Sequence, residues 1–415
     1  MLPNPYTPGQ TPHHLAGRAA EQEAIRDYLA PVIAYGDMAG PPMVITGLRG
    51  IGKTSLLDSI RDQARQDGFI TAWTSCQRGQ PFLADLTYTI DRALRAADAL
   101  PAPSGWTNAL DRIGVEIAVP VVANLGLSLS RSRQEHPRPP AGAISAVEDV
   151  LHLAANAAYG SGGRRGVGLL VVIDELHAGA PGELAVLLNA LQNLSHDRRE
   201  NPFALMGAGI PSVGGILTAA ATFGERSRWL PLPDLTIPEL AEALQAPARD
   251  LDVTWTPDAL DIAVTAAQHY PHFVQIIGSA TWRTARPTAG DTITSHHAHA
   301  GAAAGATEIT SLYDARWASV PDAERAVLTA MAKAHPTPAG DIARRDIEQA
   351  LGTDISTHRA RLIDKAIIDD TQRGYLRFTL PGFADYIRHH TTPGPPARSS
   401  HPRRPGSPDA TNARQ

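Results

Sequence analysis

The sequence contains one cysteine, few lysines and no long apolar run. Because Cys76 is the single cysteine among 415 residues, no disulfide can form within the chain, and a reducing compartment fits this usage best. The longest apolar stretch, around residues 113–129, is broken by Glu116 and Pro120, whereas a membrane-spanning helix needs about 20 mostly apolar residues. The first residues also lack the basic and apolar regions of a secretory signal. We therefore expect a cytoplasmic protein without a membrane segment.

A strong positive charge is lacking as well. The formal net charge of −5 at pH 7 argues against a protein that coats nucleic acid through bulk electrostatics. Among 37 basic residues only Lys53, Lys333 and Lys365 are lysines, so a lysine at any given motif position is improbable by chance. The length exceeds that of one ordinary core, and we expect two or three domains in a soluble globular chain.

The first 235 residues alternate between short apolar segments and stretches with helical spacing. Residues 169–173 are five consecutive apolar residues, which is typical of a strand buried on both faces of a parallel sheet. The alternation predicts an α/β fold with a parallel sheet. Strands are predicted at 43–46, 69–74, 169–173 and 203–206. Helices are predicted at 19–34, 55–66, 82–97, 144–159 and 183–195.

The remaining segments divide the chain further. Residues 101–142 are predicted to be irregular, with a hairpin formed by the weakly alternating segments 115–119 and 125–130. After residue 234 the strand pattern stops, and Thr236 with Glu239 forms the capping box of a helical region. The expected parts are an extended arm (1–18), an α/β core (19–235), a helical lid and linker (236–306), a compact unit (307–392) and a disordered, mildly basic tail (393–415).

A histidine-rich segment lies in the expected linker. His296, His297 and His299 follow one another closely, but no cysteine or paired carboxylate accompanies them, as a metal site would require. We therefore interpret them as part of a solvated linker or loose helix, and Cys76 as a small buried residue.

A phosphate-binding loop follows the first predicted strand. Residues 47–54 fit the pattern G-x-x-x-x-G-K-[ST], with a strand before them and a helix after them. Glycines allow the backbone to turn its N–H groups toward an anion, and the following helix adds its positive dipole end. Lys53 is predicted to reach the β- and γ-phosphates of ATP, and the Thr54 hydroxyl to bind Mg²⁺. The predicted nucleotide-binding residues of the loop are Gly47, Leu48, Arg49, Gly50, Ile51, Gly52, Lys53, Thr54 and Ser55.

Two carboxylates end the most apolar predicted strand. Asp174 and Glu175 directly follow residues 169–173. A carboxylate at the tip of a buried strand can orient the ligand shell of Mg²⁺, and its neighbour can polarise the attacking water. We therefore predict that Asp174 and Thr54 hold the metal and that Glu175 acts in catalysis, with ATP and Mg²⁺ as cofactors.

With these motifs in place, residues 3–390 resemble the bacterial origin-recognition-type AAA+ ATPases, a group related to archaeal ATPases and STAND switches. The resemblance includes the loop and the carboxylate pair, and it extends to several further segments. These are Asn4–Gly9, Leu15–Arg18, Gly207–Pro211, Gly224–Arg226 and Tyr270–Gln275.

The resemblance implies a P-loop NTPase parallel sheet (AAA+ core), a small helical lid and a C-terminal winged helix. It places the turn at Gly17 and Arg18 near the adenine, and it makes Arg226 a γ-phosphate sensor or a finger that acts on a neighbouring subunit. The implied activity is an Mg-dependent ATPase that couples nucleotide state to the C-terminal module. The alternative is a STAND-like or transposition-helper-type switch with little turnover, which acts through a nucleotide-dependent homo-oligomer or a protein partner.

Two positions depart from the family pattern. His269 stands where the family has a glycine in the lid turn before Pro271, which weakens the expectation that a lid residue touches the nucleotide. After the fourth predicted strand, residues 205–209 offer no polar sensor residue. Slow hydrolysis and a role as an ATP-gated switch therefore remain open.

The C-terminal unit has the pattern of a winged helix-turn-helix, with three predicted helices (323–334, 341–351 and 355–366) and two strands (367–370 and 375–380). The third helix would expose Thr357, His358 and Arg361, and Arg373 would lie at the wing tip. These side chains point to double-stranded DNA as a ligand. Residues 322–390, however, contain ten basic and ten acidic residues, so protein docking is an equal alternative. Arg398, Arg403 and Arg404 of the tail are possible non-specific DNA contacts.

Overall fold

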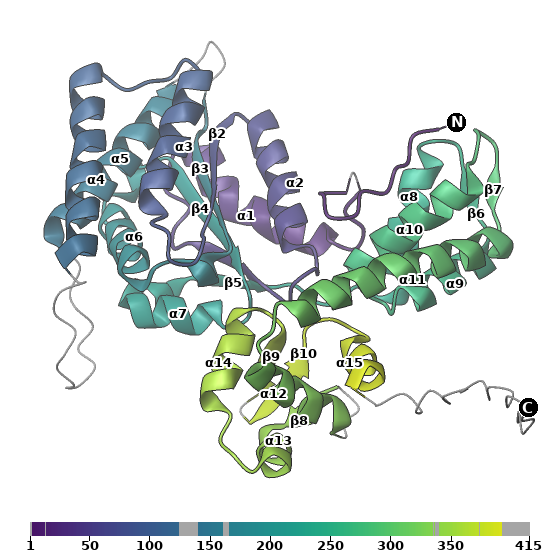
Figure 1. Cartoon of the computed structure of the whole chain (residues 1–415). Coiled ribbons are helices and arrows are strands. Elements are labelled where there is room, and N and C mark those ends of the chain that lie inside the picture. Colours follow the sequence, from purple (N-terminus) through teal and green to yellow (C-terminus); the bar gives the residue numbers. More distant parts are fainter. Residues whose placement is uncertain are drawn as a thin grey trace, which may run out of the picture. The chain divides into compact units, whose positions relative to one another are not determined.

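The structure is a computed structural model that describes residues 2–12, 14–123, 140–160, 166–334, 336, 340–372 and 374–391. It divides into two compact units, Met1–Leu312 and Tyr313–Gln415, which are described separately (Figure 1). The boundary falls inside helix α11 (Ser295–Ala318). Arg373 and the tail arginines lie outside the described residues. No helix in the described ranges is long and apolar enough to cross a membrane.

A five-stranded parallel sheet forms the centre of the first unit, in the order β2-β3-β4-β1-β5. Its strands are β1 (Met43–Thr46), β2 (Phe69–Ser75), β3 (Gly168–Asp174), β4 (Phe203–Gly209) and β5 (Arg228–Pro231). This sheet confirms the predicted α/β class and P-loop fold. The strand β5 was missed because it is a short edge strand whose residues are mostly exposed, so it carries no apolar run.

Successive residues of β3 enter two different hydrophobic cores. Leu169, Val171 and Ile173 pack into one core, whereas Leu170 and Val172 pack into the other, as the period-2 alternation of a strand requires. Helices α1 (Ala19–Tyr35) and α2 (Lys53–Gln66) close one face. The other face is closed by α3 (Leu83–Ala96), α4 (Pro103–Ala123), α5 (Ala141–Gly160), α6 (Pro181–Leu194) and α7 (Val213–Ala220). Figure 1 shows α1 and α2 on the opposite side of the strands from α3–α6.

The prediction of an irregular segment with a hairpin after residue 101 was wrong. Helix α4 runs through residues 115–119, and residues 125–130 lie outside the described part of the chain. Trp106, Ala109 and Ile113 are buried in the core on the α3–α7 face. Their spacing of three and four residues is the apolar stripe of an amphipathic helix, and it outweighs the weak alternation that follows.

A helical subdomain completes the first unit, with α8 (Ile237–Arg249), α9 (Pro257–Ala266), α10 (Pro271–Ala285), the first part of α11, and two short parallel strands, β6 (Thr254–Trp255) and β7 (Thr292–Ile293). The predicted capping box of Thr236 and Glu239 is confirmed at the start of α8. In the histidine-rich segment, His297 Nδ1 accepts a hydrogen bond from Thr294 N at 3.2 Å. This histidine therefore caps the start of α11, and no metal-binding cluster occurs among the described residues.

Helices α10 and α11 pack closely through two glycines. A Cβ atom on Gly301 would lie 2.4 Å from the Thr281 Cα atom, and one on Gly305 would lie 2.6 Å from Ile277 Cδ1. A side chain therefore does not fit at Gly301, because one of the atoms it would overlap is the Cα atom of Thr281, which is backbone and cannot move aside as a side chain can. The two helices are therefore held as one rigid pair.

The second unit contains α12 (Asp322–Lys333), α13 (Arg344–Leu351), α14 (Ser356–Asp364), α15 (Phe383–Thr391) and an antiparallel sheet in the order β8-β10-β9. Its strands are β8 (Ile342–Ala343), β9 (Ile368–Gln372) and β10 (Tyr375–Phe378). The predicted helix at 341–351 is therefore a short strand followed by a shorter helix. On α14, Thr357 and Arg361 are exposed, His358 is half-buried, and Leu362 is fully buried.

A comparison of two glycine-to-alanine substitutions tests the close packing of α10 on α11, because it distinguishes the effect of overpacking on stability from the effect of helix propensity. We expect Gly301→Ala to lower the free energy of unfolding of the first unit by about 1–3 kcal/mol, because the added methyl group overpacks the contact with Thr281. Gly215→Ala on α7 is the matched control, since its Cβ would meet no atom within 4 Å. It should stabilise by about 0.5–1 kcal/mol. Urea unfolding of both variants measures the difference, and equal effects would contradict the close packing.

Candidate functional site

The loop between β1 and α2 encloses the ammonium group of Lys53. Gly50 (φ +76°) and Gly52 (φ +103°) adopt left-handed backbone conformations that glycine tolerates best. Lys53 is 7% exposed, and its Nζ donates hydrogen bonds to the carbonyl oxygens of Gly47 at 2.9 Å and Leu48 at 2.8 Å. Burial lowers the pKa of this ammonium group, although Glu175 and Asp174 nearby oppose the shift. The loop therefore presents a concentrated positive charge at the start of α2.

The carboxyl end of β3 lies next to the start of α2. Thr54 Oγ1 donates a hydrogen bond to Asp174 Oδ2 at 2.7 Å, and the backbone N–H of Glu175 donates to Asp174 Oδ1 at 2.8 Å. Asp174 is 5% exposed, and burial raises the pKa of its carboxyl group. A hydroxyl and a carboxylate that touch each other are hard oxygen donors of the kind that Mg²⁺ prefers, so these residues fit the predicted metal.

Glu175 follows Asp174 in a left-handed backbone conformation (φ +54°, ψ +35°). It begins the short 3-10 helix η1 (Leu176–Ala178). Its Oε2 lies 3.2 Å from Nε2 of His177, a neighbour that the motif analysis did not consider. The sequence did carry a signal, because the histidine stands only two positions after the glutamate.

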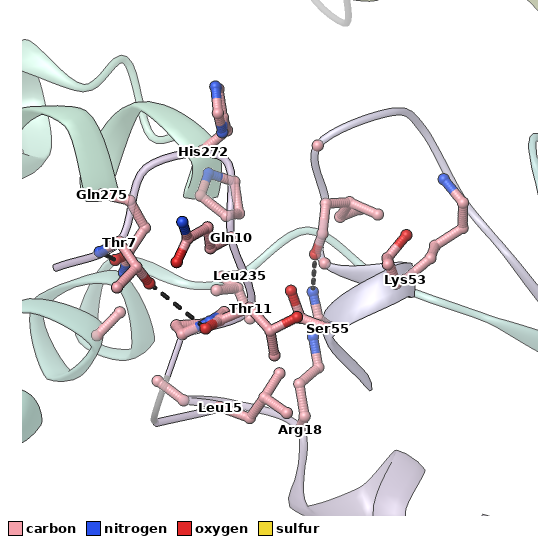
Figure 2. A pocket seen from close by; sticks show the side chains of 18 of the residues that line it. Thr7, Gln10, Thr11, Leu15, Arg18, Lys53, Ser55, Leu235, His272 and Gln275 are labelled. Carbon is pink, nitrogen blue, oxygen red and sulfur yellow. Dashed lines mark hydrogen bonds between the residues drawn. The ribbon is translucent and has the colours of Figure 1, made fainter. Parts of the chain in front are cut away.

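A cavity of about 450 Å³ connects these groups to the N-terminal arm and the helical subdomain, and pockets of 300–1,000 Å³ are typical for small-molecule ligands. Lys53, Thr54, Ser55 and Glu175 line one side. The arm lines another side, and Leu235, His272 and Gln275 line the side opposite the loop. Figure 2 shows Lys53 and Ser55 on the loop side, with Thr11 and Arg18 next to Ser55 and Gln10 on the side of His272 and Gln275. Gly47, Leu48, Asp174 and Arg226 do not line the cavity.

The arm bridges the subdomain and the core. Thr7 N donates a hydrogen bond to Gln275 Oε1 of α10 at 3.2 Å, and Thr11 Oγ1 donates to Asp58 Oδ2 of α2 at 2.5 Å. Tyr6 is buried against the subdomain, where its hydroxyl donates to the Leu244 carbonyl oxygen at 2.6 Å. The residues predicted to form an extended arm therefore line the cavity and are held there by contacts to both sides.

Arg18 is brought to the cavity but serves first as a brace. It is 1% exposed, and its guanidinium group donates to the carbonyl oxygens of Ile51 at 3.1 Å and Pro233 at 3.0 Å. The side chain thus ties the phosphate loop to the segment that leads into α8. Arg18 thus lies at the cavity wall, and that a base binds beside it stays a prediction.

Arg226 is not brought to the loop of its own chain. It ends the 3-10 helix η3 (Thr222–Arg226), is exposed, and precedes β5. The first residue of β5 pairs with Met43, the first residue of β1, whereas the loop follows the last residue, Thr46. Four strand residues span roughly 13 Å. Arg226 therefore lies toward the edge of the sheet opposite the loop.

The helical subdomain touches the loop through Tyr270. The Tyr270 hydroxyl donates a hydrogen bond to the Arg49 carbonyl oxygen, and a Cβ atom on Gly50 would lie 1.9 Å from that hydroxyl. His269 has φ +56°, so it adopts the left-handed conformation that the family's glycine would favour. The departure noted in the sequence thus preserves the turn, and a residue next to it contacts the phosphate loop.

Comparisons with known proteins agree with this geometry. Residues 14–204 match the family model described as the AAA ATPase domain, and residues 310–387 match a family described as a domain of unknown function. No curated protein sequence matches the chain. Since the AAA ATPase match includes the loop, Asp174 and Glu175, the chain contains an ATP-binding domain of the AAA+ class.

Three solved structures with similar folds come from archaea. The ORC2 protein of Aeropyrum pernix, in ADPNP–ADP complexes, is 15% identical, with a TM-score of 0.52 over 92% of this chain and 97% of that chain. The Walker-type ATPase of Pyrococcus abyssi is 16% identical, with a TM-score of 0.49 over 90% and 96%. Cdc6p of Pyrobaculum aerophilum is 13% identical, with a TM-score of 0.47 over 92% and 97%. At these identities, the similarity to ORC2 shows a shared fold.

Substituting Asp174 by asparagine should raise the stability of the ligand-free protein and lower its affinity for the metal. Because the folded-state pKa of Asp174 lies above its usual value of 3.8, the folded protein loses stability as pH rises from 3.8 through that raised pKa. At pH 7 the charge is thus a cost, and Asp174→Asn should unfold at a higher temperature than wild type without ligand. It should also lose the stabilisation by MgATP, which is about 2.7 kcal/mol at 100 times Kd.

Thermal unfolding between pH 4 and pH 7, with and without MgATP, measures both effects. Asp111→Asn is the control, because Asp111 is exposed on α4 and should change neither quantity. An unchanged MgATP shift in Asp174→Asn would contradict the assignment of the metal ligand.

Proposed function

We propose that the chain is an Mg-dependent ATPase of the AAA+ class that transmits its nucleotide state to the C-terminal unit. The observation that carries this proposal is the convergence of Lys53, Thr54, Asp174 and Glu175 beside one cavity. The groups come from β3 and from the loop and helix after β1, and they supply the positive charge, the metal ligands and the carboxylate that phosphoryl transfer requires.

Each residue of the set has a separate role. The Lys53 ammonium group holds the β- and γ-phosphates, and the loop N–H groups surround them. Thr54 and Asp174 hold Mg²⁺, which would neutralise the developing charge on the phosphate oxygens. Glu175 lines the cavity and orients the attacking water as a general base. The adenine side of the cavity lies between the arm and the start of α10, next to Arg18.

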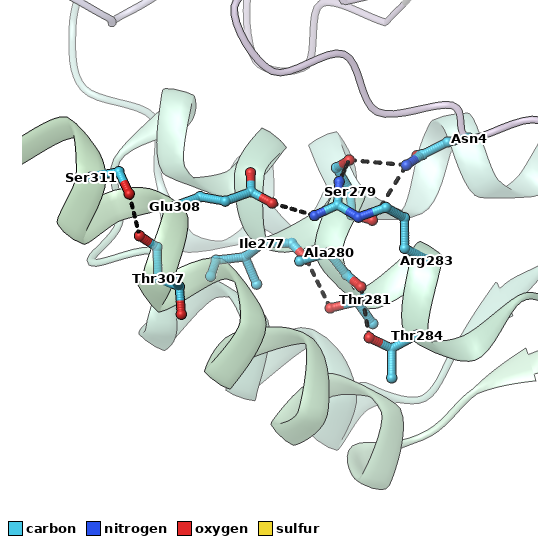
Figure 3. A network of polar contacts seen from close by, with 10 residues as sticks. All are labelled: Asn4, Ile277, Ser279, Ala280, Thr281, Arg283, Thr284, Thr307, Glu308 and Ser311. Atoms are coloured by element: carbon cyan, nitrogen blue, oxygen red, sulfur yellow. Dashed lines mark hydrogen bonds and ion pairs between the residues drawn. The ribbon is translucent and has the colours of Figure 1, made fainter.

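The subdomain offers a route from the cavity to the second unit. Helix α10 contributes Pro271, His272 and Gln275 to the cavity, and further along it carries Ser279 and Arg283. Figure 3 shows Ser279 accepting hydrogen bonds from Asn4 of the arm and from Arg283, which also pairs with Glu308 of α11. Together with the glycine packing of α10 on α11, these contacts make the arm and both helices one body, and α11 continues into the second unit.

Arg226 supports a nucleotide-dependent homo-oligomer. Its exposure and its distance from the loop of the same chain exclude an intramolecular contact with the γ-phosphate. An arginine supplied by a second copy would stabilise the transition-state charge, as an arginine finger does. We therefore propose that neighbouring subunits share one active site.

For the second unit, we propose a winged helix-turn-helix in which α14 is the exposed recognition helix. Most of the described basic side chains of the second unit already form ion pairs with carboxylates of the same unit. They are therefore less available to DNA phosphates, which favours protein docking over DNA binding. Arg361 is an exception: within the described residues, its exposed side chain has no hydrogen bond or ion pair. The paired basic residues are Arg325, Arg344, Arg345, Arg359, Lys365, Arg377 and Arg388.

The alternative function, an ATP-gated switch with little turnover, is supported by β4. Its seven residues are fully buried and carry no polar side chain, so this strand offers no sensor for the γ-phosphate. In such a switch, ATP occupancy would drive assembly, and phosphate release would be incidental.

Mixing two inactive variants tests the shared active site. We expect Lys53→Ala to weaken ATP binding at least tenfold, because the buried ammonium group is lost. Arg226→Ala should bind ATP normally but release phosphate at least tenfold more slowly. A mixture should recover activity, since Arg226 of the Lys53→Ala subunit completes the site of the other variant. Steady-state phosphate release and light scattering with and without ATP measure these effects.

Arg199→Ala is the control, because Arg199 is an exposed arginine elsewhere on the same unit and should retain full activity. Normal turnover by Arg226→Ala would refute the finger. ATP-driven assembly of the wild-type protein without turnover would identify the switch.

A salt titration tests DNA as the ligand of the second unit. If α14 binds duplex DNA, Arg361→Ala should weaken binding and lower the slope of log K against log salt concentration by about 0.9, which corresponds to one phosphate contact. Lys333→Ala removes the same charge from α12, where Lys333 is exposed, and should leave the slope unchanged. Fluorescence anisotropy between 50 and 200 mM salt measures it. Binding that does not depend on salt, or no binding, would leave protein docking as the function of this unit.

A further inference from the structure

We propose that His177 is a positioning residue that orients the Glu175 carboxylate toward the attacking water. This inference rests on the proposed function, because it assigns a role within the same site. The observation behind it is the contact of 3.2 Å between His177 Nε2 and Glu175 Oε2. Among the described residues, the carboxylate has no other polar partner.

The two side chains differ in burial in the way that a positioned base requires. The side chain of Glu175 is 34% exposed and lines the cavity, whereas the side chain of His177 is 9% exposed. The histidine therefore contacts the carboxylate from the protein side and leaves its other oxygen free for a water molecule. A base that is itself oriented by a third group is the usual arrangement of an activated catalytic pair.

The protonation state of the imidazole follows from its surroundings. Burial lowers the pKa of His177, and Lys53, Arg49 and Arg78 act in the same direction against Glu175. A neutral imidazole has one N–H group, and an ionised carboxylate can only accept a hydrogen bond. With its hydrogen on Nε2, the neutral ring is able to donate to the Glu175 carboxylate, whose Oε2 lies 3.2 Å from Nε2. Nδ1 is buried and has no partner among the described residues, so the ring position is not explained by hydrogen bonding on that side.

The backbone holds the pair in this arrangement. The left-handed conformation of Glu175 begins η1, whose turn is closed by a hydrogen bond from Ala178 N to the Glu175 carbonyl oxygen at 2.7 Å. Leu176, between the two residues, fills the space beside Gly207 of β4. A Cβ atom on Gly207 would lie 2.2 Å from the Cδ1 atom of Leu176. A non-glycine residue held at positive φ stores strain, and the turn that follows it leaves His177 Nε2 3.2 Å from Glu175 Oε2.

A double-mutant cycle tests this role. We expect His177→Ala to lower the single-turnover rate of phosphate release at least tenfold, while the Kd for MgATP changes less than twofold. His177→Gln should recover most of the rate, because its amide N–H group reaches the same position as Nε2. His177→Asn, whose shorter side chain places the amide near Nδ1, should behave like alanine. In the Glu175→Gln background, His177→Ala should cause no further loss.

His196→Ala is the control, because His196 is an exposed histidine of the same unit and should change nothing. A wild-type rate in His177→Ala, an equal loss in both backgrounds, or equal rates for the glutamine and asparagine variants would overturn the proposal. Since glutamine and asparagine retain a polar group, they keep the test valid if the alanine variant does not fold. Absence of MgATP binding by the wild-type protein would instead refute the proposed function. MgATP binding by the wild-type protein without phosphate release would also refute the proposed ATPase, whereas wild-type release that is unchanged in His177→Ala would refute only the role of His177.

Discussion

The ammonium group of Lys53 is buried inside the loop that surrounds it, and the rest of the site depends on that burial. A buried charge is costly unless polar groups compensate it, and here the carbonyl oxygens of Gly47 and Leu48 do so. These are partial charges, so the full charge of a triphosphate would be the stronger partner. The lowered pKa of Lys53 reflects the remaining cost. The loop thus folds in a form in which an anion would relieve an unfavourable interaction of the Lys53 ammonium group.

The same packing explains why β4 carries no polar sensor. This strand lies between β1 and β3 in the parallel sheet, so its carboxyl end is next to the ends of β1, which leads into the loop, and of β3, which ends at Asp174. Leu176 fills the space that Gly207 leaves, and Val213 fills the space that Gly209 leaves. A Cβ atom on Gly207 would lie 2.2 Å from Leu176 Cδ1, and one on Gly209 would lie 2.8 Å from Val213 Cβ. A polar side chain at either position would displace the turn that holds Glu175 or the start of α7. Glu175 therefore begins a tightly packed turn, and β4 carries no polar side chain beside it.

The sequence was sufficient for features that depend on neighbouring residues and insufficient for contacts between distant ones. The phosphate loop, the strand before Asp174 and the capping box of α8 are local patterns, and the structure contains each of them. The contact of Tyr270 with Arg49 joins residues 221 positions apart, and no spacing rule could reveal it. The edge strand β5 was missed because its pairing with β1, rather than its composition, makes it a strand. His177 is different, since its position two residues after Glu175 was visible but had no meaning until the backbone turn was known.

Binding of DNA by the C-terminal unit would require ion pairs within the unit to be replaced by contacts with phosphates. Most of its described basic groups already have carboxylate partners, so a DNA phosphate would have to replace an existing ion pair, and the released carboxylate would then face the phosphate backbone. Exposed ion pairs contribute only about 0–1 kcal/mol each, so breaking them costs little. The carboxylates that are released would, however, repel the DNA phosphates, and nothing would offset that repulsion. A protein surface that carries both signs of charge can exchange partners on both sides. The balanced charge of this unit is therefore matched more easily by a protein surface than by a DNA backbone.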